Sequence, residues 1–135
     1  KEFGLAQTYR PDDAGVGLRR ADVLVALKRR AEAIQSLREA LRLRPSYWEA
    51  RYLLGVELAG DGNTAEARAE FEEVVRARPD YALAHLNLGL VLASEAKFDE
   101  ASAQFRETLR LDPQNEKARQ SVETTDRLKT RHESH

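Results

Sequence analysis

The 135-residue sequence contains no cysteine and no methionine, and each absence limits what the protein can be. Without cysteine there is no disulfide, no thiolate metal ligand and no cysteine nucleophile. Methionine is missing even at position 1, so we expect a processed chain or a piece of a longer one. These absences do not fix the compartment. A cytoplasmic location is the expectation, and an extracytoplasmic domain of a larger protein is the alternative.

A strong charge of one sign and long apolar runs are also missing. The formal net charge is −1, which gives no basic surface for nucleic acid and no cationic face for a membrane. No apolar run approaches the length of a membrane span, and no apolar segment typical of a signal peptide appears in these residues. We therefore expect no nucleic-acid partner and no direct membrane insertion. Hydrophobic residues at 41% and charged residues at 33% favour a mostly helical chain with a solvated exterior.

Proline is scarce, but its four positions are regular. Pro11, Pro45, Pro79 and Pro113 are each 34 residues apart (45 − 11, 79 − 45, 113 − 79). The residues before them also repeat, as LRLRP at 41–45, VRARP at 75–79 and LRLDP at 109–113. A fixed period of this length indicates a repeat architecture.

Each 34-residue unit is predicted to contain two helices. Apolar and small residues recur at helical spacing and are interrupted by GDGN at 60–63 and near residues 96–97. Gly62 is suited to a left-handed turn, and each proline is expected to end the second helix. We expect caps at Asp12, Ser46 and Asp80, with Ser46 and Glu49 forming a capping box. Gly55 and Gly89 are expected to face Ala67 and Ala101, where two helix backbones approach closely.

These motifs resemble the tetratricopeptide repeat, as in YLLGVEL with ARAEF and ARP, and LNLGLVL with ASAQF and LDP. The resemblance implies an all-α fold, a right-handed superhelical array of helix-turn-helix repeats (an α-solenoid). The predicted repeats are residues 12–45, 46–79 and 80–113. The first is degenerate, because Gly17 and Arg20 stand at positions that usually hold large apolar residues, and its first helix is expected to be frayed or displaced.

Both ends of the array depart from the repeat. Residues 1–11 are predicted to be the stub of a preceding repeat, its second helix alone, because Phe3, Ala6 and Pro11 fall in register. A disordered leader is the alternative for this segment. Residues 114–135 are predicted to form a capping helix from about residue 115 to 129, followed by a frayed tail.

No sequence pattern carries catalytic, cofactor or metal chemistry. His85 stands where the repeat buries a large side chain, so we expect it to have a packing role. His132, Glu133 and His135 lack the H-E-x-x-H spacing that places two ligands on one helical face. The GVG at 15–17 has no third glycine and no preceding strand. We therefore expect a non-catalytic protein without a cofactor or a metal.

The resemblance also implies where a partner binds. In the family, the first helix of each repeat lines a concave groove, mainly through its second, fifth, ninth and twelfth positions. Carried over to this sequence, these positions are Gly15, Leu18, Asp22, Val25, Glu49, Tyr52, Val56, Ala59, Leu83, Leu86, Leu90 and Ala93, with Asn87 beside them. Repeats that clamp the C-terminal carboxylate of a chaperone carry lysine, arginine and asparagine on this surface. The matching positions here are Leu18, Asp22, Leu53, Leu83 and Asn87, so we reject that clamp.

The apolar character of this surface predicts that it binds an amphipathic helix or an apolar segment of another protein. An alternative for the leucines is that they pack against neighbouring helices and line no groove. Two other functions are open: a self-assembling array, joined through its truncated N-terminal end, and the regulatory tail of a larger enzyme such as a glycosyltransferase.

Overall fold

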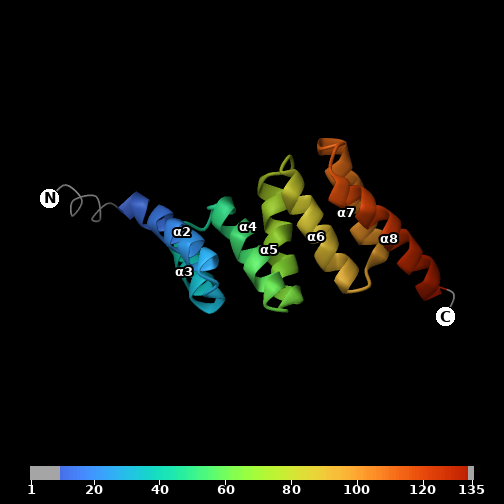
Figure 1. The fold of residues 1–135 in the computed structure, drawn as a ribbon. Helices are drawn as coiled ribbons and strands as arrows, with labels where there is room; N and C mark the ends of the chain where they lie inside the picture. The colour runs from blue at the N-terminus through green and yellow to red at the C-terminus, as the bar shows by residue number, and fades with distance from the viewer. Residues whose placement is uncertain (1–9, 134–135) are drawn as a thin grey trace.

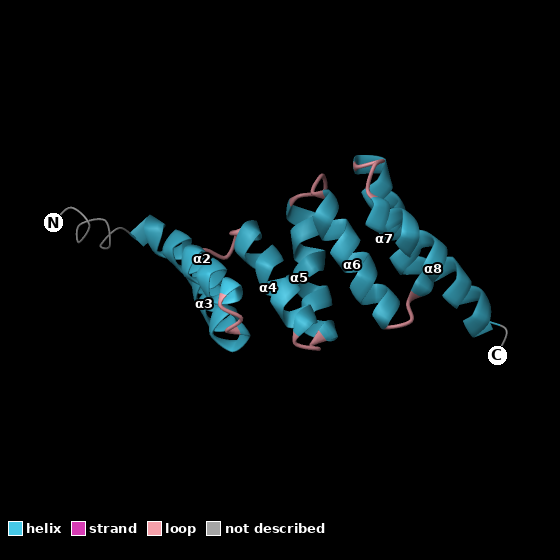
Figure 2. Ribbon diagram, in the orientation of Figure 1, coloured by secondary structure: helices cyan, strands magenta, loops and turns pink. Residues whose placement is uncertain are grey.

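The computed structural model describes residues 10–133, which form seven α-helices and, within that range, no strand (Figures 1 and 2). The helices are α2 (Arg10–Ala26), α3 (Arg30–Leu43), α4 (Trp48–Gly60), α5 (Thr64–Ala77), α6 (Ala82–Ser94), α7 (Phe98–Leu111) and α8 (Glu116–Glu133). Three pairs, α2 with α3, α4 with α5 and α6 with α7, pack most closely, and α8 packs on α7. Figure 1 shows these pairs following one another along an extended array, so the predicted all-α solenoid is confirmed.

The core of each pair is built from small residues that surround one large side chain. Phe71 in α5 and Phe105 in α7 are fully buried. A Cβ on Gly55 would lie 2.7 Å from the Phe71 ring, and one on Gly89 would lie 2.5 Å from the Phe105 ring. The nearest neighbours of these glycines are therefore aromatic rings, and the expected contacts with Ala67 and Ala101 stay predictions.

The turn inside each pair uses the same backbone conformation three times. Lys28, Gly62 and Ala96 have φ values of 61°, 85° and 62°, and one 34-residue period separates each from the next. The prediction of a left-handed turn at Gly62 is thus confirmed. Lys28 and Ala96 adopt the same conformation, although each has a Cβ that disfavours it.

The predicted helix caps after the prolines are wrong. The N-cap residues of α4 and α6 are Tyr47 and Tyr81, and neither side chain makes a capping hydrogen bond. The carboxylate of Asp80 instead accepts hydrogen bonds from Arg78. The two tyrosine rings are used for packing: Arg44 lies over Tyr47, and Tyr81 contacts Trp48 edge to face. At the start of α4 and α6, packing of a tyrosine ring takes the place of a side-chain cap. Where such a cap is present, it stabilises a helix by about 1 kcal/mol.

A hydrogen-bonded bridge ties each of these loops to the second helix that follows. In the second pair, Arg51 donates to the carbonyl of Pro45 and to Glu70, both at 2.8 Å. In the third pair, the equivalent His85 lies with one ring nitrogen 2.8 Å from the Pro79 carbonyl and the other 2.8 Å from Oε1 of Gln104. His85 is 8% exposed, so it has the packing role expected for it.

The first pair is intact. Helix α2 begins at Arg10 and runs through Pro11, so the expected start at Asp12 is wrong. Proline is tolerated in a first turn, where an N–H has no intrahelical acceptor. A Cβ on Gly17 would lie 3.1 Å from that of Ala40, so glycine permits close packing of α2 on α3. The predicted stub, with Phe3 and Ala6, lies outside the described residues apart from its last two positions.

Helix α8 runs to Glu133, four residues beyond the predicted end of the capping helix. Ala118 and Thr125 are buried, whereas Arg119, Glu123 and Asp126 are exposed. The helix therefore covers α7 with one face and presents charges on another. His132, predicted to lie in a frayed tail, is within α8, where its ring contacts that of Phe98 at 5.7 Å.

Candidate protein-binding surface

The first helices of successive pairs lie side by side, because α4 contacts α6 and α6 contacts α8 directly. We use the name first-helix surface for the predicted partner-binding residues on α2, α4 and α6. Six of them are half-buried, three are exposed and one is buried. The half-buried residues are Leu18, Val25, Tyr52, Val56, Asn87 and Leu90; the exposed ones are Asp22, Glu49 and Leu83; the buried one is Leu86.

Leu86 is 7% exposed and belongs to the hydrophobic core, so it has almost no surface to offer a partner. Helix α6 has first-helix neighbours on both sides, α4 and α8, and this explains why a position that is half-exposed on α2 becomes covered on α6. The expectation that Leu86 contacts a ligand is corrected accordingly.

Tyr52 lies at the centre of the first-helix surface. Its ring is 5.9 Å from that of Phe71 and 5.1 Å, edge to face, from that of Tyr81. Its hydroxyl accepts a hydrogen bond of 2.9 Å from Nδ2 of Asn87, across the α4–α6 contact. Burial raises the pKa of the Tyr52 hydroxyl above its ordinary value, and this group therefore stays protonated at neutral pH.

Asn87 is held by a second hydrogen bond. Its Nδ2 also donates to the carbonyl of Leu83 one turn earlier, at 3.0 Å. Both amide protons thus have acceptors within α4 and α6, and the side-chain oxygen remains available as an acceptor. The pair formed by Tyr52 and Asn87 is a fixed polar group among the apolar side chains of α4 and α6.

An aromatic cluster next to Tyr52 was not recognised from the sequence as part of this surface. Trp48 and Tyr81 are in edge-to-face contact at 4.9 Å, and the guanidinium of Arg78 lies 4.7 Å from the Trp48 ring centre. The recurrence of tyrosine at 47 and 81, one period apart, was the available signal, because it places a ring at the start of both α4 and α6.

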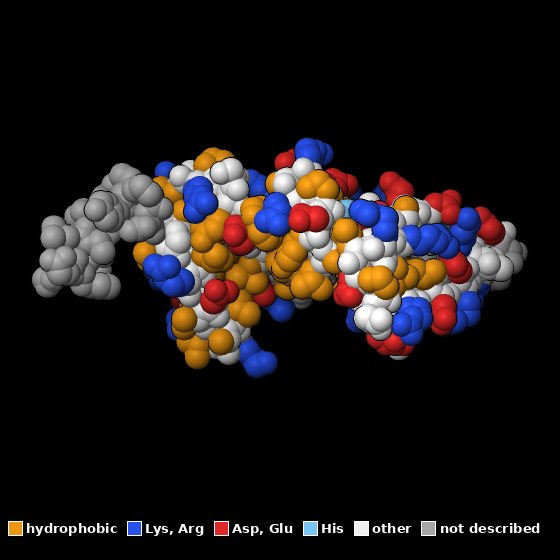
Figure 3. Space-filling model, turned by 90° about the horizontal axis from the view of Figure 1, so that it is seen from above, with side chains coloured by type: hydrophobic (Ala, Val, Ile, Leu, Met, Phe, Trp, Pro, Cys, Tyr) orange, Lys and Arg blue, Asp and Glu red, His pale blue; other side chains and the backbone are white. Residues whose placement is uncertain are grey.

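The surface continues toward the C-terminal end as a hollow of about 280 Å³ between α6 and α8. Leu90 and Ala93 of α6 line it, together with polar side chains of α8 such as Lys117, Gln120 and Thr124. In the view from above, hydrophobic atoms gather over the N-terminal and middle parts of the array, whereas charged atoms dominate its C-terminal end (Figure 3). The accessible apolar side chains of the first-helix surface are Leu18 and Val25 on α2, Tyr52 and Val56 on α4, and Leu83 and Leu90 on α6.

The described residues contain no cluster of three or more potential metal ligands and no buried side-chain polar atom without a hydrogen-bond partner. Within the same range no helix is long and apolar enough to cross a membrane. Buried or half-buried carboxylates are neutralised by arginine, as in Glu57 with Arg30 at 3.1 Å and Glu70 with Arg51 at 2.8 Å. The first-helix surface therefore offers a partner apolar contact area and a few fixed polar groups.

Comparisons with known proteins agree on the architecture. A family model described as tetratricopeptide repeat matches residues 18–70 and again residues 52–116. No curated protein sequence matches the chain. Several solved structures are similar, and each is a tetratricopeptide repeat protein or has this fold.

MamA (residues 41 to the end) from Desulfovibrio magneticus RS-1 shares 24% identity over 91% of this chain and 70% of its own, with a TM-score of 0.84. The first TPR of Spaghetti (RPAP3), bound to the HSP90 peptide SRMEEVD, shares 17% identity over 87% of this chain and 93% of its own, with a TM-score of 0.84. YrrB, described as a TPR protein with an unusual peptide-binding site, shares 25% identity over 82% of this chain and 57% of its own, with a TM-score of 0.77.

Proposed function

Because the chain belongs to the tetratricopeptide repeat family, we propose that it is a non-catalytic interaction module that binds another protein on its first-helix surface. The ligand we propose is an amphipathic helix or an apolar segment. Similar folds that bind peptides, among them the RPAP3 repeat with its HSP90 peptide, support this class of function.

The observation that carries the proposal is a row of accessible apolar side chains on two neighbouring helices. Tyr52 and Val56 on α4 are half-buried, as is Leu90 on α6, and Leu83 is 44% exposed. An accessible leucine beside a half-buried aromatic residue is typical of a protein contact, because a partner covers apolar area that is otherwise in water. The row contains no basic residue that would select an acidic C-terminal peptide.

Polar groups around the row narrow the chemistry of the ligand. Asp22 and Glu49 are exposed acidic residues of the first-helix surface, and they favour lysine or arginine on the flanks of the bound segment. The oxygen of Asn87 can accept a hydrogen bond from a ligand donor. We therefore propose a ligand with apolar residues at i, i+3, i+4 and i+7 and basic residues beside them.

Selection from a displayed library of 12- to 20-residue peptides tests this proposal. We expect enriched peptides to carry the apolar spacing and to bind Val56→Glu at least about tenfold more weakly, because a charge in the row must be desolvated. Ala69→Glu, an exposed site on α5, is the matched control and should bind like the unchanged protein. Both variants should melt within a few degrees of it.

Two results would refute the proposal. The first is enrichment of acidic C-terminal peptides in place of amphipathic ones. The second is equal affinity of the enriched peptides for the unchanged protein and for Val56→Glu, which would place their contact elsewhere on the array.

A further inference from the structure

The charges along the row of first helices are separated by sign. The exposed acids of the first-helix surface, Asp22 and Glu49, lie on α2 and α4, and its residues on α6 are uncharged. Helix α8 continues the row beyond α6 and presents Lys117, an exposed base. The charge therefore changes from acidic on α2 and α4 to basic on α8, with the uncharged face of α6 between them.

One helix position shows this change most directly. Glu49, Leu83 and Lys117 are the second residues of α4, α6 and α8, and one 34-residue period separates each from the next (83 − 49, 117 − 83). All three side chains are exposed. Because α4 contacts α6 and α6 contacts α8, a segment that lies across the three helices passes an acid, a leucine and a base in that order.

The two charged side chains at this position are available to a ligand. Neither Glu49 nor Lys117 makes a side-chain hydrogen bond or an ion pair with any described residue. Other exposed carboxylates of the array are paired, as Glu39 is with Arg42 and Glu116 with Arg119. A ligand can therefore pair with Glu49 and Lys117 without breaking an existing ion pair.

Lys117 lies beside groups that suit a carboxylate. It is the one charged residue among those that line the hollow between α6 and α8. Gln120, Ser121 and Thr124 line the same hollow, and each can donate a hydrogen bond. An acidic side chain placed there would meet a cation and neutral donors, and charge-assisted hydrogen bonds of this kind are the stronger ones.

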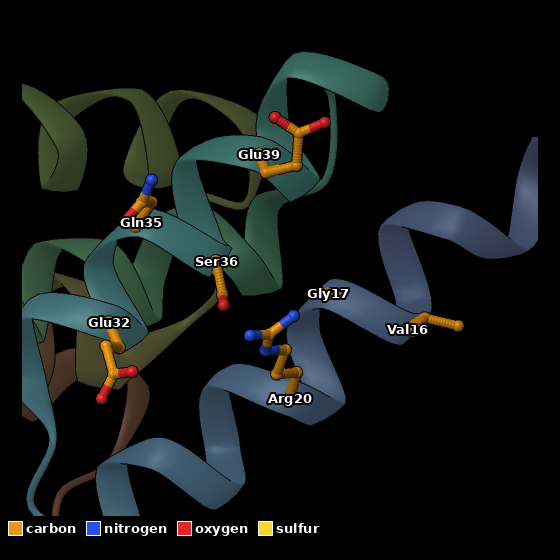
Figure 4. A pocket seen from close by; sticks show the side chains of 7 residues that line it. All are labelled: Val16, Gly17, Arg20, Glu32, Gln35, Ser36 and Glu39. Atoms are coloured by element: carbon orange, nitrogen blue, oxygen red, sulfur yellow. The ribbon is translucent and has the colours of Figure 1, made fainter.

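Two hollows elsewhere on the described array carry both signs of charge. Arg20, Glu32 and Glu39 line the hollow between α2 and α3 (Figure 4). The hollow beside α5 and α7 has Arg76 together with Glu72 among its lining residues. A carboxylate of a ligand would be repelled by a protein carboxylate in both places, so the hollow at Lys117 is the better site for it.

On the basis of the protein-binding function above, we propose that the first-helix surface takes a helix of another protein whose charges are segregated. Its basic end lies over Glu49 and its acidic end enters the hollow at Lys117. Apolar side chains between the two ends contact Tyr52, Val56 and Leu83. Packed helices are about 8–10 Å apart, so the two ends are about 16–20 Å apart and about 11–13 residues of helix join them.

Three displayed libraries of peptides of about 18 residues test the charge order. They share a randomised amphipathic centre and differ in their ends: lysine at one end and glutamate at the other, lysine at both, or glutamate at both. The unchanged protein should enrich the first library. Lys117→Glu should enrich the library with lysine at both ends, and Glu49→Lys the one with glutamate at both.

Lys97→Glu is the matched control, because it makes the same change of charge at an exposed residue in the turn between α6 and α7. It should keep the preference of the unchanged protein. Since Glu49, Lys97 and Lys117 are all exposed, the three variants should also melt within a few degrees of it.

The tightest peptide, synthesised with blocked termini, gives the size of the effect. Its affinity for Lys117→Glu should fall about threefold to tenfold at low salt, and the loss should shrink at high salt. The same peptide with its glutamates replaced by lysine should regain affinity for Lys117→Glu, which a merely structural effect of the variant would not produce.

A nitroxide label at either end of this peptide places it on the full isotope-labelled chain. A label at the acidic end should broaden the amide signals of α8, and a label at the basic end those of α4. Broadening of α4 by the acidic end would overturn the proposal.

The remaining outcomes separate this proposal from the protein-binding function. Equal enrichment of the three libraries, with binding still lost in Val56→Glu, would overturn the charge order and leave that function standing. The absence of binders, or binders that Val56→Glu does not affect, would overturn both. Dimerisation of the chain alone in sedimentation, abolished by Val56→Glu, would identify a second copy as the occupant and overturn the proposed partner.

Discussion

The three left-handed turns predict that glycine and alanine have opposite effects at one repeat position. Ala96→Gly should stabilise the protein, because φ is 62° and the left-handed region costs a residue with a Cβ about 1–2 kcal/mol. Gly62→Ala should destabilise it for the same reason. A Cβ on Gly62 would meet no atom within 4 Å, so no packing contact obscures the backbone effect.

The magnitude follows from two opposing terms. Relief of the strained conformation favours glycine by about 1–2 kcal/mol, and the larger entropy of the unfolded glycine opposes it by about 0.4–1 kcal/mol. The net change in unfolding free energy is therefore about 0.5–1 kcal/mol in each direction. At the midpoint this corresponds to a shift in melting temperature of about 4 °C or less.

Urea unfolding followed by circular dichroism measures the two changes, and native-state hydrogen exchange locates them in the α6–α7 and α4–α5 pairs. Ala69→Gly on the exposed side of α5 is the matched control, because there glycine should cost about 1 kcal/mol. If Ala96→Gly destabilises the protein as Ala69→Gly does, then the turn at Ala96 is not held in the left-handed conformation and the reasoning fails.

Four other substitutions test the core, one exposed position and one ion pair. Leu54→Ala should cost about 2–5 kcal/mol by urea unfolding, whereas Arg20→Leu, at an exposed site, should be neutral or stabilising. Equal losses would contradict the assigned register. Leu86→Glu should lower the melting temperature by more than ten degrees, because a buried position must accept a carboxylate; a change of a few degrees would return Leu86 to the partner-binding residues. Arg38 donates to Glu66 at 2.6 Å and lowers the pKa of that carboxyl, so their pairing stabilises the fold above the ordinary glutamate pKa and is lost as pH falls through the depressed value. Arg38→Ala should therefore be less stable than the unchanged protein at pH 7 but not at pH 3, and a loss that is independent of pH would refute the linkage.

The period of 34 residues predicted most of the architecture, because it depends on contacts that every pair repeats. Helix pairing, the turn at Gly62 and the burial of Phe71 and Phe105 follow from apolar spacing within one unit. In the degenerate first pair (α2 with α3), the side chains at the two central core positions are exchanged in size. At the positions of Gly55 and Phe71 it has Ala21 and Leu37, both fully buried, so an added methyl group on one helix accompanies a smaller side chain on the other.

What the sequence did not predict depends on neighbours outside a single unit. Leu86 lies on a helix that has both α4 and α8 as neighbours, and no rule within the repeat states that a capping helix contacts α6. The start of α4 depends on whether Ser46 caps the helix or Tyr47 packs its ring, and two stabilising effects of similar size cannot be ranked from local sequence. The extension of α2 through Pro11 has the same origin, because proline is compatible both with the end of one helix and with the first turn of the next.

The outer side of α8 differs in chemistry from the corresponding side of α4 and α6. At the position of Gly55 and Gly89, where each glycine admits a phenylalanine ring from the following helix, α8 carries Glu123. A ring packed there would have to displace or desolvate a carboxylate, so the outer side of α8 opposes the kind of contact that holds the other pairs together. Addition of a further second helix at α8 is therefore disfavoured, whereas α4 and α6 each receive one on the corresponding side.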